Sequence, residues 1–190
     1  MNKTFYEDEN FKGIDYSSQN LKGTEYENCN FSNCIFANAN LSDVNFAECS
    51  FENCDFSNMK IQNTAFKDVR FKDCKLIGLH FENCNPFLFT VNFHGCSLNL
   101  SSFYQCTLKS TLFKNCSLQE VDFTEAVMNA SSFDNCDLAG AVFESANLEK
   151  VDFRTSYNYS FDPELNRIKK AKFSRMEVIG LLNKYDIEIH

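Results

Sequence analysis

The sequence predicts an all-β solenoid, in which the chain turns once every five residues and stacks successive coils into a rod. Two observations predict this fold: a large apolar residue recurs at every fifth position, and a small or apolar residue recurs two positions before it. A third is that charged residues avoid both positions between residues 20 and 155. A chain of 190 residues, 44% of them hydrophobic, supplies enough apolar surface for one such domain.

The large apolar residue defines position i of each repeat. No polar residue occupies this position from Tyr16 to Phe81, and after a break the series resumes at Leu88 and continues to Phe153. Five residues advance an α-helix by about 500°, which carries the apolar stripe about 140° away from its own face. An odd period also sends successive apolar residues of a straight strand to opposite faces. The chain must therefore change direction once per repeat.

Position i−2 is equally restricted, because from Thr24 to Val151 it holds only Cys, Ala, Val, Thr, Ser, Met and Leu. Residues two apart in an extended segment share a face, so i and i−2 both point inward while i−1, i+1 and i+2 face solvent. Between residues 20 and 155, all seventeen acidic and all ten Lys or Arg residues occupy outward positions. The charges therefore support the same inward and outward assignment independently.

The number of sides follows from longer spacings. Phe recurs every ten residues from Phe93 to Phe153, with Leu or Met between. Cysteines recur every twenty residues, at Cys34, Cys54 and Cys74 and again at Cys96, Cys116 and Cys136. Four sides of five residues would stack each series in a column, so the spacings favour a four-sided coil.

Runs such as Glu27-Asn28-Cys29-Asn30-Phe31 and Glu52-Asn53-Cys54-Asp55-Phe56 resemble the A(D/N)LXX motif of the pentapeptide-repeat family, and twenty-eight such repeats are present. The resemblance implies a right-handed quadrilateral β-helix with a short C-terminal helical cap. We expect an N-terminal lead-in over residues 1–13, the solenoid over 14–155 with an interruption at 84–88, and a cap and dimerisation tail over 156–190.

Catalytic, cofactor and metal sites are not expected. All ten cysteines lie at position i−2, where Ala, Val, Ser and Thr also occur, so we interpret them as buried thiols rather than disulfides or metal ligands. His80 and His94 flank the break at outward positions and His190 lies at the C-terminus, with no paired nucleophile or carboxylate. Phosphate-binding loops and hydrolase elbows are absent from the sequence. An enzyme would need a ligand-sized pocket near Pro86.

The composition argues against two classes of partner, nucleic acids and membranes. The net charge of −8 and pI of about 4.9 argue against direct binding of nucleic acid. No apolar run approaches the ~20 residues of a membrane span, and residues 1–10 lack the layout of a signal peptide. We therefore expect no membrane contact and a cytoplasmic location.

The break centres on Pro86, which stands where the next large apolar residue belongs. Proline cannot donate to a strand ladder, so pairing should lapse at Pro86 and Phe87 and the rod should bend there. A structural insertion is one interpretation, and a partner contact through Phe87 and Phe89 is the other.

The C-terminal tail combines several signals of a cap. Asp162-Pro163-Glu164 predicts a helix start, and Ser174 with Glu177 forms a capping-box pair. The apolar residues Val178, Leu181, Leu182 and Tyr185 follow at helical spacing, and Ile187 and Ile189 alternate like a strand. This apolar face either covers its own rod or also meets a second copy. From Lys172 onward the tail resembles that of quinolone-resistance (Qnr-type) and mycobacterial pentapeptide proteins, which implies a homodimer.

The same resemblance implies that an acidic rod imitates duplex DNA and binds DNA gyrase or topoisomerase IV, protecting it from fluoroquinolones. The candidate DNA-mimic surface consists of the six acids between residues 23 and 59, a stretch without Lys or Arg: Glu25, Glu27, Asp43, Glu48, Glu52 and Asp55. The alternative is a structural or scaffold module for an unrelated protein partner. The basic stretch from Lys60 to Lys75 and the lack of long projecting loops favour that alternative.

Overall fold

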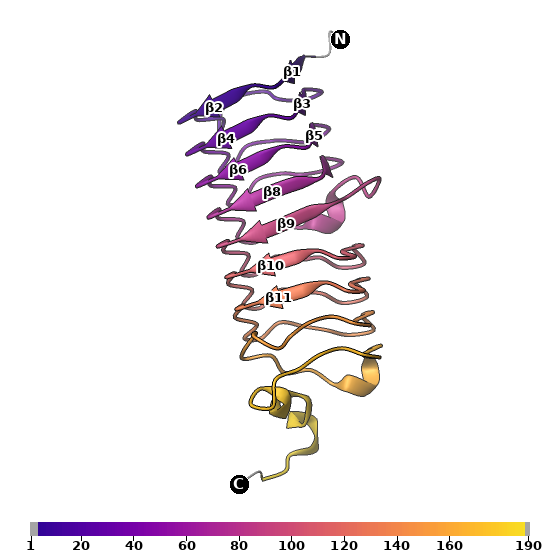
Figure 1. Cartoon of the computed structure of the whole chain (residues 1–190). Helices are drawn as coiled ribbons and strands as arrows, with labels where there is room; N and C mark the ends of the chain where they lie inside the picture. Colours follow the sequence, from indigo (N-terminus) through magenta and orange to yellow (C-terminus); the bar gives the residue numbers. More distant parts are fainter. Residues whose placement is uncertain (1–3, 189–190) are drawn as a thin grey trace.

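The computed structural model describes residues 4–188, which form one rod of stacked coils with the N-terminus at one end and the C-terminus at the other (Figure 1). Each side of a coil is only five residues long, so the strands and helical turns are short. In chain order they are β1 (Phe5–Glu7), β2 (Asn10–Lys12), β3 (Glu25–Glu27), β4 (Asn30–Ser32), β5 (Asn45–Ala47), β6 (Ser50–Glu52), β7 (Ala65–Lys67), β8 (Val69–Lys72), η1 (Phe81–Asn83), β9 (Val91–His94), β10 (Leu112–Lys114), β11 (Ser132–Asp134), η2 (Pro163–Leu165), η3 (Val178–Leu181) and η4 (Asn183–Tyr185).

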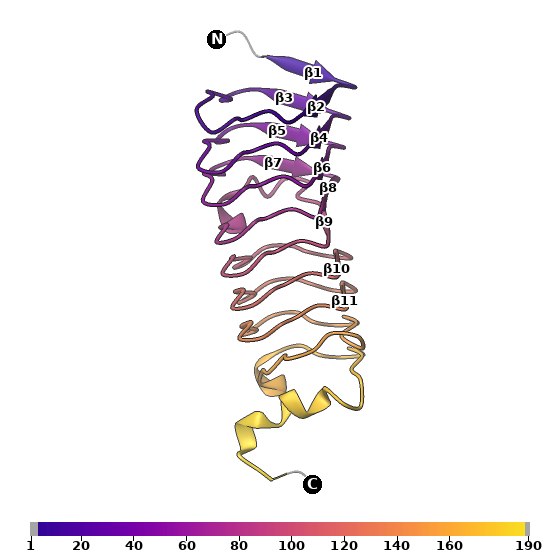
Figure 2. The ribbon, with the colours of Figure 1, turned by 90° about the vertical axis from the view of Figure 1, so that its left-hand side faces the viewer.

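Every strand pairs in parallel with the strand one coil away. One sheet has the order β1-β3-β5-β7, and the second contains β2, β4, β6, β8, β9, β10 and β11 in sequence (Figure 2). The register joins residues twenty apart, as in Phe31 with Phe51, and twenty-two apart across the break, as in Phe71 with Phe93. Isolated parallel bridges such as Ile35 with Asp55 and Asn40 with Lys60 form the other two sides. The coil is therefore four-sided, as the cysteine spacing predicted.

The corners of the coil are made at position i+2, which adopts positive φ in almost every repeat. Asn33 has φ 54° and Asn53 has φ 53°, and Gly78 has φ 67° at the same position. Asn, Asp and Gly tolerate this left-handed conformation better than other residues. The corner amide is also held from the next coil, because the N–H of Asn33 donates to the carbonyl of Glu52 at 2.9 Å. The many Asn residues at position i+2 are a signal in the sequence that predicts this corner.

The core consists of the inward residues i and i−2, which are buried as predicted along almost the whole rod. Its continuous feature is one column of stacked aromatic rings whose neighbouring centroids lie 4.7–5.4 Å apart. Such offset-stacked rings add to the free energy gained from burial. The column contains Phe11, Phe31, Phe51, Phe71, Phe93, Phe113, Phe133, Phe153 and Phe173.

The regular stacking is interrupted between η1 and β9. Pro86 follows Asn85, whose side-chain oxygen accepts the N–H of Phe87 at 2.9 Å, and this turn directs Phe87 and Leu88 outward. The expectation that position i resumes at Leu88 is wrong, because 61% of Leu88 is exposed. Phe89 packs against the core instead. It stands two residues before the buried start of β9, so an extended approach to that strand points its side chain inward.

Both ends of the rod extend beyond the expected limits. β1 and β2 already pair with the second coil, so regular structure begins before residue 14. Glu9 stands at an inward position there but is exposed, because no coil covers it on one side. At the other end, Lys172 still bridges to Asp152, and the Phe173 ring stacks on Phe153 at 5.3 Å.

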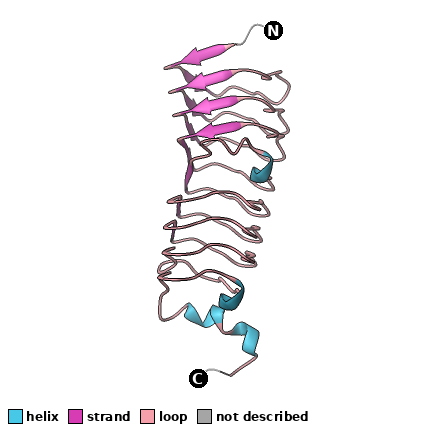
Figure 3. Ribbon diagram, turned by 90° about the vertical axis from the view of Figure 1, so that its right-hand side faces the viewer, coloured by secondary structure: helices cyan, strands magenta, loops and turns pink. Residues whose placement is uncertain are grey.

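The expected helical signals of the tail are realised as short 3₁₀ turns (Figure 3). Asp162 caps η2 by accepting the N–H of Glu164 at 2.8 Å, and Ser174 accepts the N–H of Glu177 at 3.0 Å. The expected strand at the end of the tail is not seen at Ile187, and Ile189 lies outside the described residues.

We expect the Phe113→Ala substitution to lower the free energy of unfolding by about 3–5 kcal/mol, because it removes one ring from the middle of the stack and leaves a cavity. Leu112→Ala in the same strand is the matched control, because Leu112 is 40% exposed, and it should cost less than about 0.5 kcal/mol. Urea unfolding followed by circular dichroism measures both. Equal losses for the two variants would contradict the assignment of Phe113 to the interior.

Candidate interaction surfaces

Negative charge is concentrated at the N-terminal end of the rod. Residues 4–59 contain ten Asp or Glu and two Lys, a net charge of −8, whereas residues 60–190 contain sixteen acids and fifteen bases, a net charge of −1. Residues 4–59 form almost three coils, which span about 13 Å at ~4.8 Å per coil. The N-terminal coils therefore carry about one net negative charge per 1.7 Å of rod, and the rest of the rod is nearly neutral.

The six acids of the predicted DNA-mimic surface do not share one face. Glu25 and Glu27 lie on β3 in the four-stranded sheet, and Glu52 lies on β6 in the seven-stranded sheet. Asp43 and Glu48 occupy corners, with φ 61° and 55°, and Asp55 lies on a third side, bridged to Lys75. The structure thus distributes the six acids around the circumference of the N-terminal coils.

One edge of these coils carries several acids in neighbouring rungs, and we name it the acidic corner: Glu7, Asp8, Glu27 and Glu48. The β1–β3 register places Glu7 directly opposite Glu27. Asp8, Asn28 and Glu48 occupy the same corner in three successive coils, each with positive φ. Asp8 accepts a hydrogen bond from the side chain of Asn28 at 2.7 Å. Within residues 4–188, no ion pair involves Glu7, Glu27 or Glu48. Their charge is therefore presented to solvent.

Asp43, Glu52 and Asp55 of the predicted surface are each paired with a basic residue one coil away. Asp43 lies 3.3 Å from Lys22, Asp55 lies 3.9 Å from Lys75, and Glu52 pairs with Lys72. Hydrogen bonds from Asn63 and Lys22 lower the pKa of Asp43 below its usual value. These pairs are exposed and contribute little to stability, but they reduce the charge that a partner meets.

The basic stretch that follows the acidic coils is a ring around one coil. Lys60, Lys67 and Lys75 lie on three different sides, and Arg70 and Lys72 lie on β8 on the fourth. This ring marks the boundary of the acidic coils.

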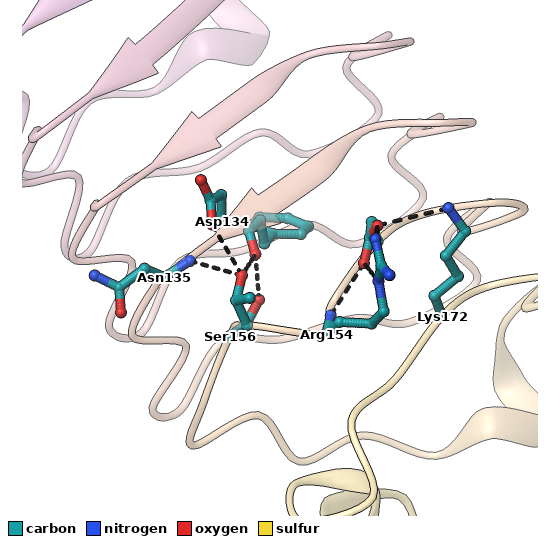
Figure 4. A network of polar contacts seen from close by, with 8 residues as sticks. Asp134, Asn135, Arg154, Ser156 and Lys172 are labelled. Atoms are coloured by element: carbon teal, nitrogen blue, oxygen red, sulfur yellow. Dashed lines mark hydrogen bonds and ion pairs between the residues drawn. The ribbon is translucent and has the colours of Figure 1, made fainter.

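Some carboxylates of the C-terminal coils, Asp134, Glu149 and Asp152, are paired with basic residues. Asp152 is paired with Arg154 at 2.8 Å and with Lys172 at 3.6 Å. Figure 4 shows Arg154 and Lys172 in this network, beside a set of hydrogen bonds around Asp134, Asn135 and Ser156. Hydrogen bonds from Arg154 lower the pKa of Asp152 below its usual value. Because acids and bases are nearly equal in number over residues 60–190, little net field remains around the C-terminal coils.

The break exposes a small apolar protrusion. Phe87 is 67% exposed beside Leu88, and the Lys67 ammonium lies 5.9 Å from the Phe87 ring centroid. The prediction that Phe89 contacts a partner is not supported, because Phe89 is turned toward the core, with its ring 6.2 Å from that of Phe81.

The tail has one face on the rod and one in solvent. Of the predicted dimer residues, Leu181 is buried against the rod, whereas Val178, Leu182 and Tyr185 are 36–49% exposed. Two further apolar residues, Met176 and Ile179, are exposed on the same short segment. A Cβ on Gly180 would overlap the carbonyl oxygen of Tyr159, so this glycine allows the close approach of the tail to the rod. The sequence did not reveal this contact, because Tyr159 lies outside the regular repeat.

The histidines lie at the surface. The expectation that no carboxylate is placed with the histidines is wrong at His80, whose Nδ1 lies 2.9 Å from Glu82 Oε1, because the turn at η1 brings residues two apart together. His94 is exposed, and His190 falls outside the described residues. Among residues 4–188, no three His, Cys, Asp or Glu side chains are grouped so that they could hold a metal ion. Over the same range, no helix has the length and apolarity needed to cross a membrane.

Comparison with known proteins identifies the repeat. The family model described as "Pentapeptide repeat region" matches residues 24–86, 87–159 and 107–178. No curated protein matches the sequence significantly. Among solved structures, a trypsin-treated variant of QnrB1, a plasmid-mediated fluoroquinolone resistance protein, aligns with a TM-score of 0.64 and 17% identity over 98% of this chain and 99% of that chain.

A second solved structure is equally similar in shape. HetL, a pentapeptide repeat protein involved in heterocyst differentiation regulation from the cyanobacterium Nostoc sp. strain PCC 7120, aligns with a TM-score of 0.64 and 13% identity. That alignment covers 90% of this chain and 87% of HetL. Likeness at such low identity establishes the fold alone, and it confirms the expected right-handed quadrilateral β-helix.

Gly180→Ala should detach the tail from the end of the rod, because the added methyl group cannot fit against the Tyr159 carbonyl. Cleavage by trypsin after Arg175 or Lys184 should then accelerate at least tenfold, since proteolysis follows the population of the opened tail. Leu165→Ala is the control, because Leu165 is 57% exposed outside the tail contact and its truncation should leave the rate nearly unchanged. Unchanged cleavage in Gly180→Ala would show that this contact does not hold the tail.

Proposed function

Because the chain belongs to the pentapeptide-repeat family, we propose that it is a non-catalytic interaction rod whose N-terminal coils imitate duplex DNA and bind DNA gyrase or topoisomerase IV. The observation that carries this proposal is the charge density of residues 4–59, a net charge of −8 on almost three coils. Bound in the DNA-binding groove, the rod would protect the enzyme from fluoroquinolones. The protein itself would remain chemically unchanged.

The magnitude of the charge supports mimicry. Duplex DNA carries one negative charge per ~1.7 Å of its axis, and the N-terminal coils carry about the same net density. A groove built to bind phosphates would attract these coils by the same long-range field that attracts DNA. The nearly neutral remainder of the rod would add little to this attraction, so we assign recognition to the N-terminal coils and in particular to the acidic corner.

Similarity to QnrB1 supports the same proposal, because that protein is a fluoroquinolone resistance protein of the same fold. The distribution of the six acids around the coil is compatible with a groove that surrounds the rod on more than one side. Partial pairing of Asp43, Glu52 and Asp55 reduces the field that such a groove would meet. We therefore expect the acidic corner to dominate binding.

A second candidate function is a scaffold for an unrelated protein partner. HetL has the same fold and an equal TM-score, and it takes part in the regulation of heterocyst differentiation. The exposed pair Phe87 and Leu88 favours this candidate, because adjacent exposed apolar side chains on a rigid rod are suited to anchor a protein partner.

We also propose that two copies associate through the tail around a two-fold axis. The exposed apolar side chains of Met176, Val178, Ile179, Leu182 and Tyr185 would be covered in such a dimer, while Leu181 holds the tail to its own rod. End-to-end association would place the two acidic ends at the far tips of a longer rod. Cytoplasmic location belongs to the same proposal, since topoisomerases act there.

Neutralising the acidic corner tests the mimicry. The triple variant Glu7→Gln, Glu27→Gln and Glu48→Gln should raise the concentration that halves gyrase supercoiling about tenfold, and should weaken protection from ciprofloxacin in parallel. Supercoiling of relaxed plasmid, followed on agarose gels, measures both effects.

The matched control is Glu120→Gln, Glu125→Gln and Glu144→Gln, which removes three exposed charges from the C-terminal coils. This control should behave like the parent protein. Equal effects of the two triple variants would mean that only total charge matters, and no inhibition or binding by the parent protein would end the topoisomerase proposal in favour of the scaffold.

Ile179→Asp combined with Leu182→Asp should convert a dimer to a monomer, because charged side chains would have to be buried in the contact. Light scattering after size-exclusion chromatography should then fall from about twice the mass of the 21.9 kDa chain to that mass. Leu100→Asp, at an exposed corner of the rod, is the control and should stay dimeric. A parent protein that already elutes as a monomer at micromolar concentration would contradict the dimer.

A further inference from the structure

Two of the ten cysteines differ from the rest. Eight thiols donate hydrogen bonds to backbone carbonyls, as Cys54 does to Phe31 at 3.6 Å and Cys136 to Phe113 at 3.4 Å. Within the described residues, Cys84 and Cys106 donate none. Cys106 is also the one cysteine that is partly exposed, whereas the other nine are buried.

Both of these thiols line the same surface cavity at the break. The cavity has a volume of about 220 Å³, and its apolar wall includes Phe81, Pro86 and Phe89. It exists because the chain between η1 and β9 leaves the regular path of the coil. A small oxidant can therefore reach Cys106, and through the cavity Cys84, without unfolding the rod.

Cys84 and Cys106 occupy the same inward column on successive coils. They are twenty-two residues apart, which is the register across the break, as the bridge between His80 and Ser102 shows. Adjacent parallel strands lie ~4.8 Å apart, within the Cα separation of about 4.4–6.8 Å that a disulfide spans.

The backbone between Cys84 and Cys106 also has one hydrogen bond fewer than the backbone between other stacked cysteines. The carbonyls of Cys54 and Cys74 each accept a backbone N–H from the next coil at 3.0 Å, from Lys75 and Ser97. The equivalent bond, from the N–H of Thr107 to the carbonyl of Cys84, is missing in residues 4–188. The backbone around Cys84 and Cys106 can therefore adjust to the dihedral angles that an S–S bond needs, whereas the other stacked cysteines are fixed by these bonds and buried away from solvent.

We propose that Cys84 and Cys106 form a redox-sensitive pair, which a hydroperoxide converts to a disulfide across the break. The Cys106 sulfur attacks the peroxide, the O–O bond breaks, and the first water leaves as Cys106 becomes a sulfenic acid. The Cys84 sulfur then displaces the hydroxyl group of the sulfenic acid, which forms the S–S bond and releases the second water. With hydrogen peroxide as the oxidant, the two thiols lose two electrons and two protons in total, and the peroxide is reduced to two molecules of water.

The surroundings of Cys106 set the conditions of this reaction. Burial and the nearby Glu82 carboxylate raise the pKa of Cys106 to about 12. The other titratable groups at the cavity are Cys84 and Tyr104, whose hydroxyl donates to Glu125 at 3.4 Å. Because the thiolate is the nucleophile, oxidation should be slow at neutral pH and faster in alkaline solution.

The test is oxidation of the full chain with hydrogen peroxide at pH 8.5, followed by chymotrypsin digestion and mass spectrometry without reduction. Chymotrypsin cleaves after Phe87 and Tyr104 and separates the two cysteines, whereas trypsin would leave both in the segment between Lys75 and Lys109. We expect a Cys84–Cys106 disulfide as the dominant product. Cys54 and Cys74, which also lie on successive coils, are the internal control and should remain thiols.

The melting temperature gives a second readout. The disulfide closes a twenty-two-residue segment, so oxidation should raise Tm by about 5 °C in the parent protein and leave it unchanged in Cys106→Ser. A dominant disulfide between any other pair, or oxidation of Cys106 to sulfinic acid without a cross-link, would overturn the proposal. The parent protein alone decides this outcome, so the proposal stays testable if Cys106→Ser folds poorly.

Discussion

The structure depends on one constraint, which is that the backbone must turn at every fifth residue and still hydrogen-bond to the coil beside it. Both requirements meet at position i+2, where φ is positive and the amide donates to the next coil, as in Asn33 to Glu52. In the C-terminal coils, position i+2 is also occupied by residues that disfavour positive φ, such as Leu100, Gln105 and Ala130. The bonds between coils therefore maintain the corners there. They also fix the register that stacks the phenyl rings and aligns the outward charges.

Much of the fold was predictable because the burial of a residue in this architecture depends only on its position within its own five-residue repeat. Residues i and i−2 share a face whatever the rest of the chain does, so the burial of Phe31, Cys34 and Leu138 followed from spacing alone. The prediction of four sides had less support, since it rested mainly on the twenty-residue recurrence of cysteine. Caps at Asp162 and Ser174 were also visible, because each depends on residues three or fewer positions apart.

Features that depend on the path of the chain in space were not predictable. Leu88 fits the series by composition, but the turn at Asn85 directs it outward and leaves Phe89 to fill the gap. Six acids close in sequence lie on different sides, because each step of five residues rotates the chain by one side of the coil. Cys106 shares its repeat position with nine buried cysteines and is partly exposed because the neighbouring coil leaves its regular path. The contact of Gly180 with Tyr159 joins two segments that follow no repeat.

The functional account rests on an acidic end of the rod taking the place of duplex DNA. Its most direct test is competition: a fluorescent DNA duplex is bound to a type II topoisomerase, and its anisotropy is followed while the protein is added at several salt concentrations. Mimicry predicts that the protein displaces the duplex completely, and that its apparent affinity falls as salt increases. A stable complex that contains enzyme, duplex and protein together would contradict the account, because the rod would then bind somewhere other than the DNA-binding groove.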